Sequence, residues 1–154
     1  QEFEKIERDV AKGDWYQRIY AHNKLVVNSY ARRPGLMRCL FQLADEDDVF
    51  GRMLRDSFLQ QMLWLVKLMP YLFPKVEFKE HQALMVAYSL AGAGETLMKE
   101  YFVNQNEVLT RSKLNVEELT ELLSVMFYRG LFLENPPEAA LDYTKNLTDM
   151  VKTD

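Results

Sequence analysis

Hydrophobic residues recur every three or four positions along most of this chain, which is the spacing of an amphipathic helix. Ile19, Val26 and Tyr30, for example, share one helical face. No stretch of useful length alternates apolar and polar residues in the manner of a strand. The pattern therefore predicts an all-α fold, a bundle of six or seven helices. The expected helices are 2–12, 14–32, 34–44, 48–69, 78–104, 116–133 and 137–151.

The ends of these helices carry residues that start or stop a helix. Asn115 and Glu118 have the spacing of a capping box at the start of the sixth helix. The acidic run Asp45–Asp48 places negative charge at the start of the fourth helix. The same run could be an aspartate-rich Mg²⁺ motif, but the helix start that directly follows it favours capping. Pro70 and Pro74 are expected to end the fourth helix.

Size and charge narrow the classes of protein. The chain has 154 residues, so we expect one domain with a sizeable core. Its net charge is −4, so we do not expect this chain itself to bind nucleic acid. Cys39 is the single cysteine, which excludes an internal disulfide and suits a reducing, cytoplasmic location. The longest apolar runs are too short or too polar to span a bilayer, so no membrane partner is expected.

Candidate chemistry is sparse. The two histidines, His22 and His81, do not have the spacing of metal ligands. Gly92 and Gly94 supply only part of a phosphate-binding glycine motif, and they follow a helix rather than a strand. Nothing in the sequence supports catalysis, so we expect no enzyme activity, no metal site and no cofactor.

Three of the expected helices carry polar residues within an apolar face. Buried polar groups need partners, so these side chains could bond one another inside the core. Alternatively, they line a mostly apolar pocket of the kind that binds small molecules. In the pocket interpretation the polar residues are His22, Asn23, Gln61, His81, Tyr88 and Glu95, with Gly92 leaving room beside them. The apolar walls are Trp15, Ile19, Phe41, Phe58, Met62, Leu65 and Met85.

A stripe of small residues follows another face of helix 78–104, about 160° from Gly92. Small side chains at this spacing let a second helix approach closely. That helix could belong to the same chain or to a second copy across a two-fold axis. Because helix 116–133 also has a broad apolar face, two such helices per subunit would form a four-helix dimer interface. Its expected residues are Ala83, Ala87, Ala91, Gly94, Met98 and Tyr101, with Leu119, Leu122, Leu123, Met126 and Phe127.

Three stretches carry a resemblance to a known family. They are YARRPGLMRCLFQLADEDDVFGRM (30–53), ALMVAYSLAGAGETLMKEYF (83–102) and LNVEELTELLSVMFYRGLF (114–132). In these stretches and in helix order, across roughly 14–133, the chain resembles the C-terminal regulatory domain of the TetR family of bacterial transcriptional regulators.

The resemblance implies a helical domain that forms a homodimer through its last two long helices. It also implies a pocket for a small, often hydrophobic effector, whose binding shifts the dimer and releases operator DNA. The family's N-terminal helix-turn-helix is absent from this chain, so residues 1–12 would be the tail of the connecting helix and 13–154 the regulatory domain. DNA binding would then belong to a region outside the chain.

Two other functions remain open from the sequence. The chain could be a helical dimerisation or interaction module that binds no ligand, with its polar core residues bonded to one another. It could also be a small α-helical enzyme, although no residue set points to a reaction.

Overall fold

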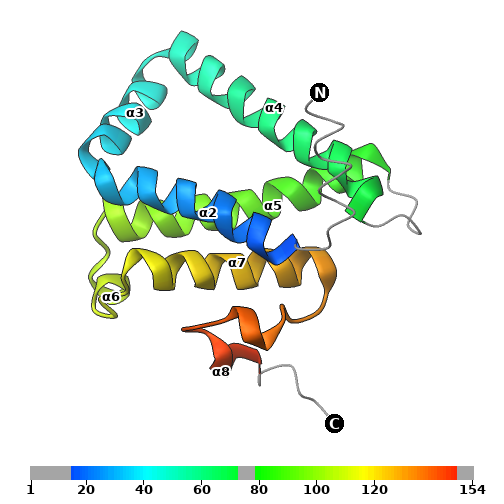
Figure 1. The fold of residues 1–154 in the computed structure, drawn as a ribbon. Coiled ribbons are helices and arrows are strands. Elements are labelled where there is room, and N and C mark those ends of the chain that lie inside the picture. Colours follow the sequence, from blue (N-terminus) through cyan, green and yellow to red (C-terminus); the bar gives the residue numbers. More distant parts are fainter. Residues whose placement is uncertain (1–14, 73–78, 149–154) are drawn as a thin grey trace.

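The computed structural model describes residues 15–72 and 79–148, and within them the chain contains helices and their connections but no strand (Figure 1). This confirms the predicted all-α class. The predicted helix 2–12 lies outside the described residues. The elements are α2 (Trp15–Arg32), α3 (Pro34–Glu46), α4 (Asp48–Leu72), α5 (Glu80–Met98), the π-helix η1 (Lys99–Val103), α6 (Glu107–Thr110), α7 (Val116–Phe132), the 3₁₀ turn η2 (Glu138–Ala140) and α8 (Lys145–Thr148).

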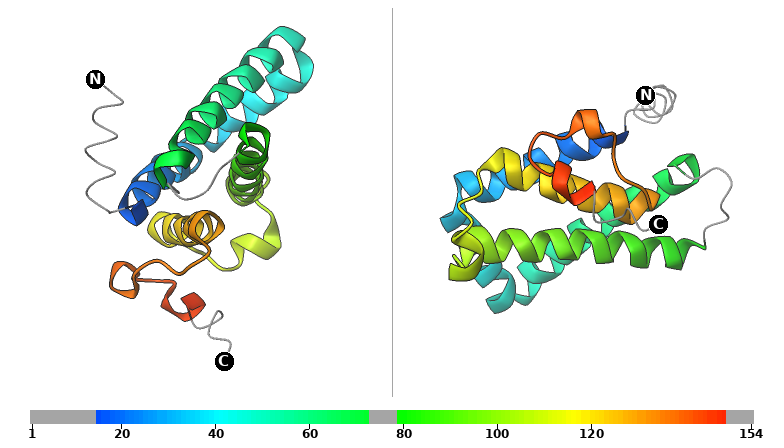
Figure 2. Two further views of the ribbon diagram at one scale, coloured as in Figure 1. Left: turned by 90° about the vertical axis from the view of Figure 1, so that its right-hand side faces the viewer. Right: turned by 90° about the horizontal axis from the view of Figure 1, so that it is seen from below.

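Helix α7 is the element on which the others assemble. Helix α2 packs along it, α5 contacts a second side, and the C-terminal segment lies below it in Figure 1. Helices α3 and α4 form an arm in which α4 runs from the α3 corner to the beginning of α5. Figure 2 shows the same arm from two further directions. The main core cluster joins α2, α5, η1 and α7 through Val27, Tyr30, Met98, Val103, Leu119 and Leu123.

Two helix starts predicted from the sequence are present with the expected hydrogen bonds. The Glu118 N–H donates to Asn115 Oδ1 at 2.9 Å, and the Asn115 N–H donates to Glu118 Oε2 at 2.7 Å, which completes the capping box of α7. Within the acidic run, Asp47 caps α4 by accepting from the N–H groups of Val49 and Phe50, both at 2.8 Å. These bonds satisfy donors that a helix start leaves unpaired.

Two predicted helix ends differ from the structure. Pro70 lies inside α4, which continues to Leu72, because a proline in the last turn removes one backbone donor without preventing two further helical residues. Pro74 lies outside the described residues. The predicted helix 78–104 is α-helical only to Met98 and then widens into the π-turn η1.

The predicted helix 137–151 is wrong in the part that the structure describes. In its place are a three-residue 3₁₀ turn, a link that bends at Asp142 and Tyr143, and the four-residue helix α8. The cause is a buried carboxylate on α7, because Glu121 is only 2% exposed and binds the link. It accepts hydrogen bonds from the N–H groups of Asp142 (2.7 Å), Tyr143 (2.6 Å) and Thr144 (2.6 Å) and from the Thr144 hydroxyl (2.8 Å).

Further contacts hold this C-terminal segment in place. Arg129 of α7 donates to Asn135 Oδ1 at 2.7 Å and to the carbonyl oxygen of Leu147. Leu141, 1% exposed, packs in a small core cluster with Tyr16 and Val125. Two charged side chains of α7 and one buried leucine are therefore major attachments of the segment.

The α2–α7 contact contains a buried polar link. Asn23 is 4% exposed, and its Nδ2 donates to Ser124 Oγ at 3.2 Å. The Ser124 hydroxyl donates in turn to the Thr120 carbonyl at 2.6 Å. The chain satisfies these polar groups internally, as buried polar groups require.

Replacing Glu121 tests the C-terminal anchor. Burial alone would raise the pKa of Glu121, but the hydrogen bonds from Asp142, Thr144 and Tyr143 outweigh it and lower the pKa below the ordinary 4.5. A lowered folded pKa stabilises the fold above the ordinary value, and this contribution is lost as the pH falls from 4.5 through the folded pKa. We expect Glu121→Gln to cost about 2–3 kcal/mol at neutral pH, measured by urea unfolding.

The cost of Glu121→Gln should shrink steadily in unfolding curves recorded at pH values below the ordinary carboxyl range. The control is Glu117→Gln, on the same helix, because this exposed side chain forms only a 3.8 Å surface ion pair with Lys24. That variant should lose no more than about 1 kcal/mol. A cost for Glu121→Gln that is the same at every pH would contradict the assignment.

Candidate functional site

The predicted pocket residues of α4 and α5 meet through an aromatic pair. The rings of Phe58 and Tyr88 lie 5.3 Å apart, edge to face. Tyr88 stays 37% exposed, whereas Met62 is 7% exposed, and Leu65 is partly buried. The pair therefore joins the two helices while part of its apolar surface faces solvent.

The predicted residues of α2 and α3 lie in different surroundings. Phe41 of α3 packs on Tyr30, with ring centres 6.3 Å apart, and the ammonium of Lys99 lies 4.6 Å from the centre of its ring. Trp15 and Ile19 are partly buried, and the guanidinium of Arg18 lies 5.1 Å from the centre of the Trp15 ring. Phe41 therefore packs against the main core from α3.

The predicted polar residues do not form one cluster. Asn23 is buried against α7 and bonded to Ser124, so the core interpretation describes it. His22, Gln61 and His81 are exposed. Met85, a predicted wall, is also 70% exposed.

Glu95 is partly buried and lies within electrostatic reach of Tyr30. Burial, and then the charge of Glu95, raise the pKa of Tyr30 to about 12. Tyr30 therefore stays neutral at physiological pH.

The two glycines of α5 have different surroundings, as their opposite faces predict. A Cβ atom added at Gly94 would lie 3.3 Å from Phe127 Cε2 and 3.7 Å from Leu123 Cδ2. A Cβ atom added at Gly92 would meet nothing within 4 Å. Gly94 therefore allows α7 to approach α5, and the space beside Gly92 is open.

The small-residue stripe meets helices of its own chain. Gly94 packs against α7, and Met98 joins Leu119 and Leu123 in the main core. Among the residues predicted for a dimer interface, Ala83, Ala87, Gly94, Met98, Leu119 and Leu123 are buried within the single chain. Ala91, Tyr101, Leu122 and Phe127 are partly buried, and Met126 is 48% exposed.

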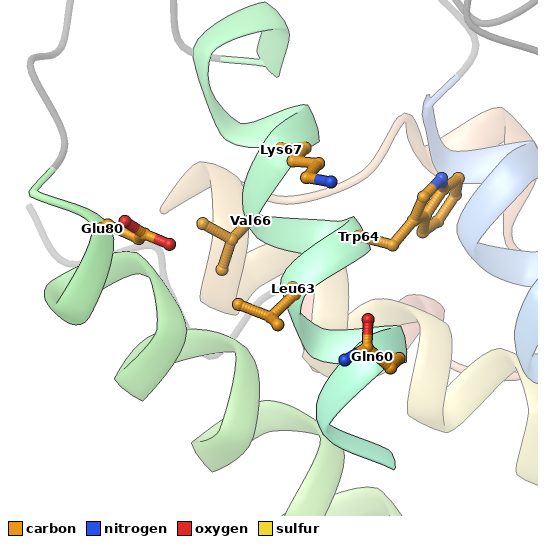
Figure 3. Close-up of a pocket in the computed structure, with 6 residues that line it drawn as sticks. All are labelled: Gln60, Leu63, Trp64, Val66, Lys67 and Glu80. Atoms are coloured by element: carbon orange, nitrogen blue, oxygen red, sulfur yellow. The ribbon is translucent and has the colours of Figure 1, made fainter. Parts of the chain in front are cut away.

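A groove between α4 and α5 was not predicted from the sequence. It has a volume of about 470 Å³. In Figure 3 the side chains of Leu63 and Val66 lie on the Glu80 side of α4, and Trp64 and Lys67 extend on the other side. Its lining residues are Gln60, Leu63, Trp64, Val66, Lys67 and Glu80.

Most of the groove residues on α4 are next in sequence to Gln61, Met62 or Leu65, which are predicted pocket residues. Each neighbour is turned by about 100° on the helix. Trp64 is 48% exposed, with Gln60 one turn before it and Lys67 one turn after it. A large aromatic residue flanked by polar groups at this spacing was the available signal for an exposed site on α4.

The described residues contain neither a metal-binding cluster nor a membrane-spanning helix. Among residues 15–72 and 79–148, no group of three or more His, Cys, Asp or Glu side chains is arranged to hold a metal ion. In the same ranges, no helix combines the length and the apolar character needed to cross a bilayer.

Comparison of the chain with protein-family models, with curated proteins and with solved structures gives no match.

The contrast between the two glycines is open to a direct test. Gly94→Leu would drive a side chain into Phe127 and Leu123, and we expect a loss of about 1–3 kcal/mol from overpacking. Gly92→Leu is the matched control, and it should gain up to about 1 kcal/mol because leucine favours a helix interior more than glycine does. Thermal or urea unfolding measures both. Equal effects of the two substitutions would contradict the assignment of the two faces.

Proposed function

We propose that this chain is the effector-binding and dimerisation domain of a TetR-like transcriptional regulator rather than an enzyme. Its support is the helix order together with the resemblance of residues 30–53, 83–102 and 114–132. Operator binding would belong to a helix-turn-helix outside this chain, in keeping with the net charge of −4.

The partly exposed aromatic pair of α4 and α5 is the observation that carries the effector proposal. Phe58 and Tyr88 present ring surface to solvent beside the open space at Gly92, one helical turn further along α5. Exposed apolar side chains extend over both helices, which suits a small hydrophobic or aromatic effector. They are Val49, Met53, Leu54, Trp64 and Tyr71 of α4, and Met85 and Tyr88 of α5.

An effector bound there could act on the rest of the domain through α5. Helix α4 contacts α3 and α5, and α5 packs on α7 at Gly94. A ligand that binds between α4 and α5 would favour the arrangement in which both helices contact it. The ligand can shift the equilibrium between the two arrangements only by as much as its affinities for them differ.

The proposed dimer face lies beside the stripe predicted from the sequence. Leu90 of α5 lies against Gly130 of α7, which brings the exposed sides of the two helices together. Val86 is 42% exposed and Met126 is 48% exposed, and Ala93 is exposed as well. An apolar face of this kind, shared by two helices, can meet its own copy across a two-fold axis.

One observation favours a second candidate, a helical module that binds no ligand. The hydrogen bond between Asn23 and Ser124 accounts for one of the polar residues assigned to the pocket. If the remaining polar residues contact only solvent and bind no ligand, the domain would dimerise without an effector.

Fluorescence of Trp64 tests the effector proposal. Trp15→Phe leaves Trp64 as the single tryptophan, since the chain has two. A screen of small apolar and aromatic compounds should yield at least one that shifts Trp64 emission and raises the melting temperature. Tyr88→Ala should weaken that response about tenfold or more, because it removes a ring of the proposed site. Tyr143→Ala is the matched control, since Tyr143 is 47% exposed and belongs to the C-terminal segment. A broad screen without any response would count against an effector.

Light scattering tests the dimer. We expect the wild-type chain to have twice the monomer mass of 18.2 kDa and Met126→Glu to be a monomer, because a charge buried in an apolar interface lacks a partner. Met53→Glu is the control, as Met53 is 64% exposed on α4, away from this face. The proposed dimer would be contradicted if the wild-type chain were a monomer or if Met126→Glu left the mass unchanged.

A further inference from the structure

The segment that follows α7 is attached to it mainly through hydrogen bonds with side chains of α7. We call residues 134–147 the C-terminal strap. Glu121 holds its middle through four hydrogen bonds, and Arg129 holds it at Asn135 and Leu147. Regular structure within the strap is limited to η2 and α8, of three and four residues. Most of its attachment therefore depends on two side chains of α7.

Two features of the closed strap are unfavourable. Leu133, the residue immediately before it, has a left-handed backbone (φ 55°) and an 89% exposed side chain. For a residue other than glycine this conformation is strained. Beneath the strap, Tyr16 is 3% exposed, and its hydroxyl has no hydrogen-bond partner among residues 15–72 and 79–148. A buried hydroxyl without a partner loses the hydrogen bonds that it would make in water.

The unpaired hydroxyl lies next to the strap's own anchor. Tyr16 packs with Val125 and with Leu141 of the strap in one small cluster. Burial, and then the negative charge of Glu121, raise the pKa of Tyr16, so the two side chains are electrostatically close. In the closed state four donors of the strap bind Glu121, and the Tyr16 hydroxyl has no partner in the part of the chain that the structure describes.

We propose that the C-terminal strap is a detachable cover, which opens about Leu133 as a unit while α2 and α7 remain packed. Opening withdraws Leu141 from Tyr16 and Val125, and it releases the Glu121 carboxylate. The Tyr16 hydroxyl then gains water or Glu121 as an acceptor. The closed state therefore has the hydrogen bonds of the strap to Glu121, and the open state has a hydrogen bond of the Tyr16 hydroxyl. This inference is independent of the proposed function.

Hydrogen exchange resolved by residue, on the chain as it exists, tests the strap. The amides of Asp142, Tyr143 and Thr144 report opening, because their N–H groups bind Glu121. Amides in the middle of α2 and α7, such as Val27 and Val125, report unfolding of the core. In the wild-type chain the strap amides should exchange at least tenfold faster than the core amides, after correction for intrinsic rates.

Tyr16→Phe gives the distinguishing result. It removes the unpaired hydroxyl from the closed state, so strap exchange should slow by about five- to thirty-fold. The matched control Tyr20→Phe alters a partly buried neighbour of Tyr16 and should leave strap exchange unchanged. Thr144→Val removes one bond to Glu121 and should speed strap exchange while the core amides keep their rates.

Three outcomes would overturn the proposal. The strap and core amides could exchange at one common rate, which would mean that the strap opens only with global unfolding. Tyr16→Phe could leave the strap rate unchanged or raise it. Thr144→Val could speed the core amides as much as those of the strap.

Discussion

Helices α2 and α7 pack against each other along most of their length, with Val27 and Val125 fully buried in the two helices. Within this contact the Asn23 amide donates to Ser124, so the register between the helices is specified as well as stabilised. Sliding one helix by a turn would leave a buried amide without its partner, which is costly in a low-dielectric interior. The other contacts depend on this pair, because α5 approaches α7 at Gly94 and the strap is held by Glu121 of α7.

The elements that the sequence predicts well are those whose signals are local. The capping box of Asn115 and Glu118 spans three residues, and the structure confirms it. The C-terminal region was mispredicted because its conformation is fixed from a distance. Glu121 binds backbone groups 21 to 23 residues further along the chain. Neither apolar spacing nor helix propensity carries that information, so a helix over 137–151 was the natural prediction.

The candidate site was predictable only as a set of helix faces. His22 and Asn23 are adjacent in sequence and differ by about 100° around α2, which is enough to leave one exposed and to bury the other against α7. The pattern does locate Phe58 and Tyr88 on faces that meet. It does not distinguish a helix of the same chain from a helix of a second copy, and the small-residue stripe at Gly94 meets α7 of its own chain.

The π-turn η1 has a consequence for how the chain leaves α5. The Asn104 N–H donates to the Lys99 carbonyl, five residues back, at 2.9 Å. Each turn of this kind holds more residues than an α turn, so the side chains after Met98 change phase relative to α5. Tyr101 and Phe102, neighbours in sequence, both pack against the main core, and the Val103 carbonyl is within reach of Arg38 of α3 at 2.5 Å. The π-turn thus changes which side chains at the end of α5 face the core. It brings this end of the helix into contact with α3, and the chain then turns back towards α7.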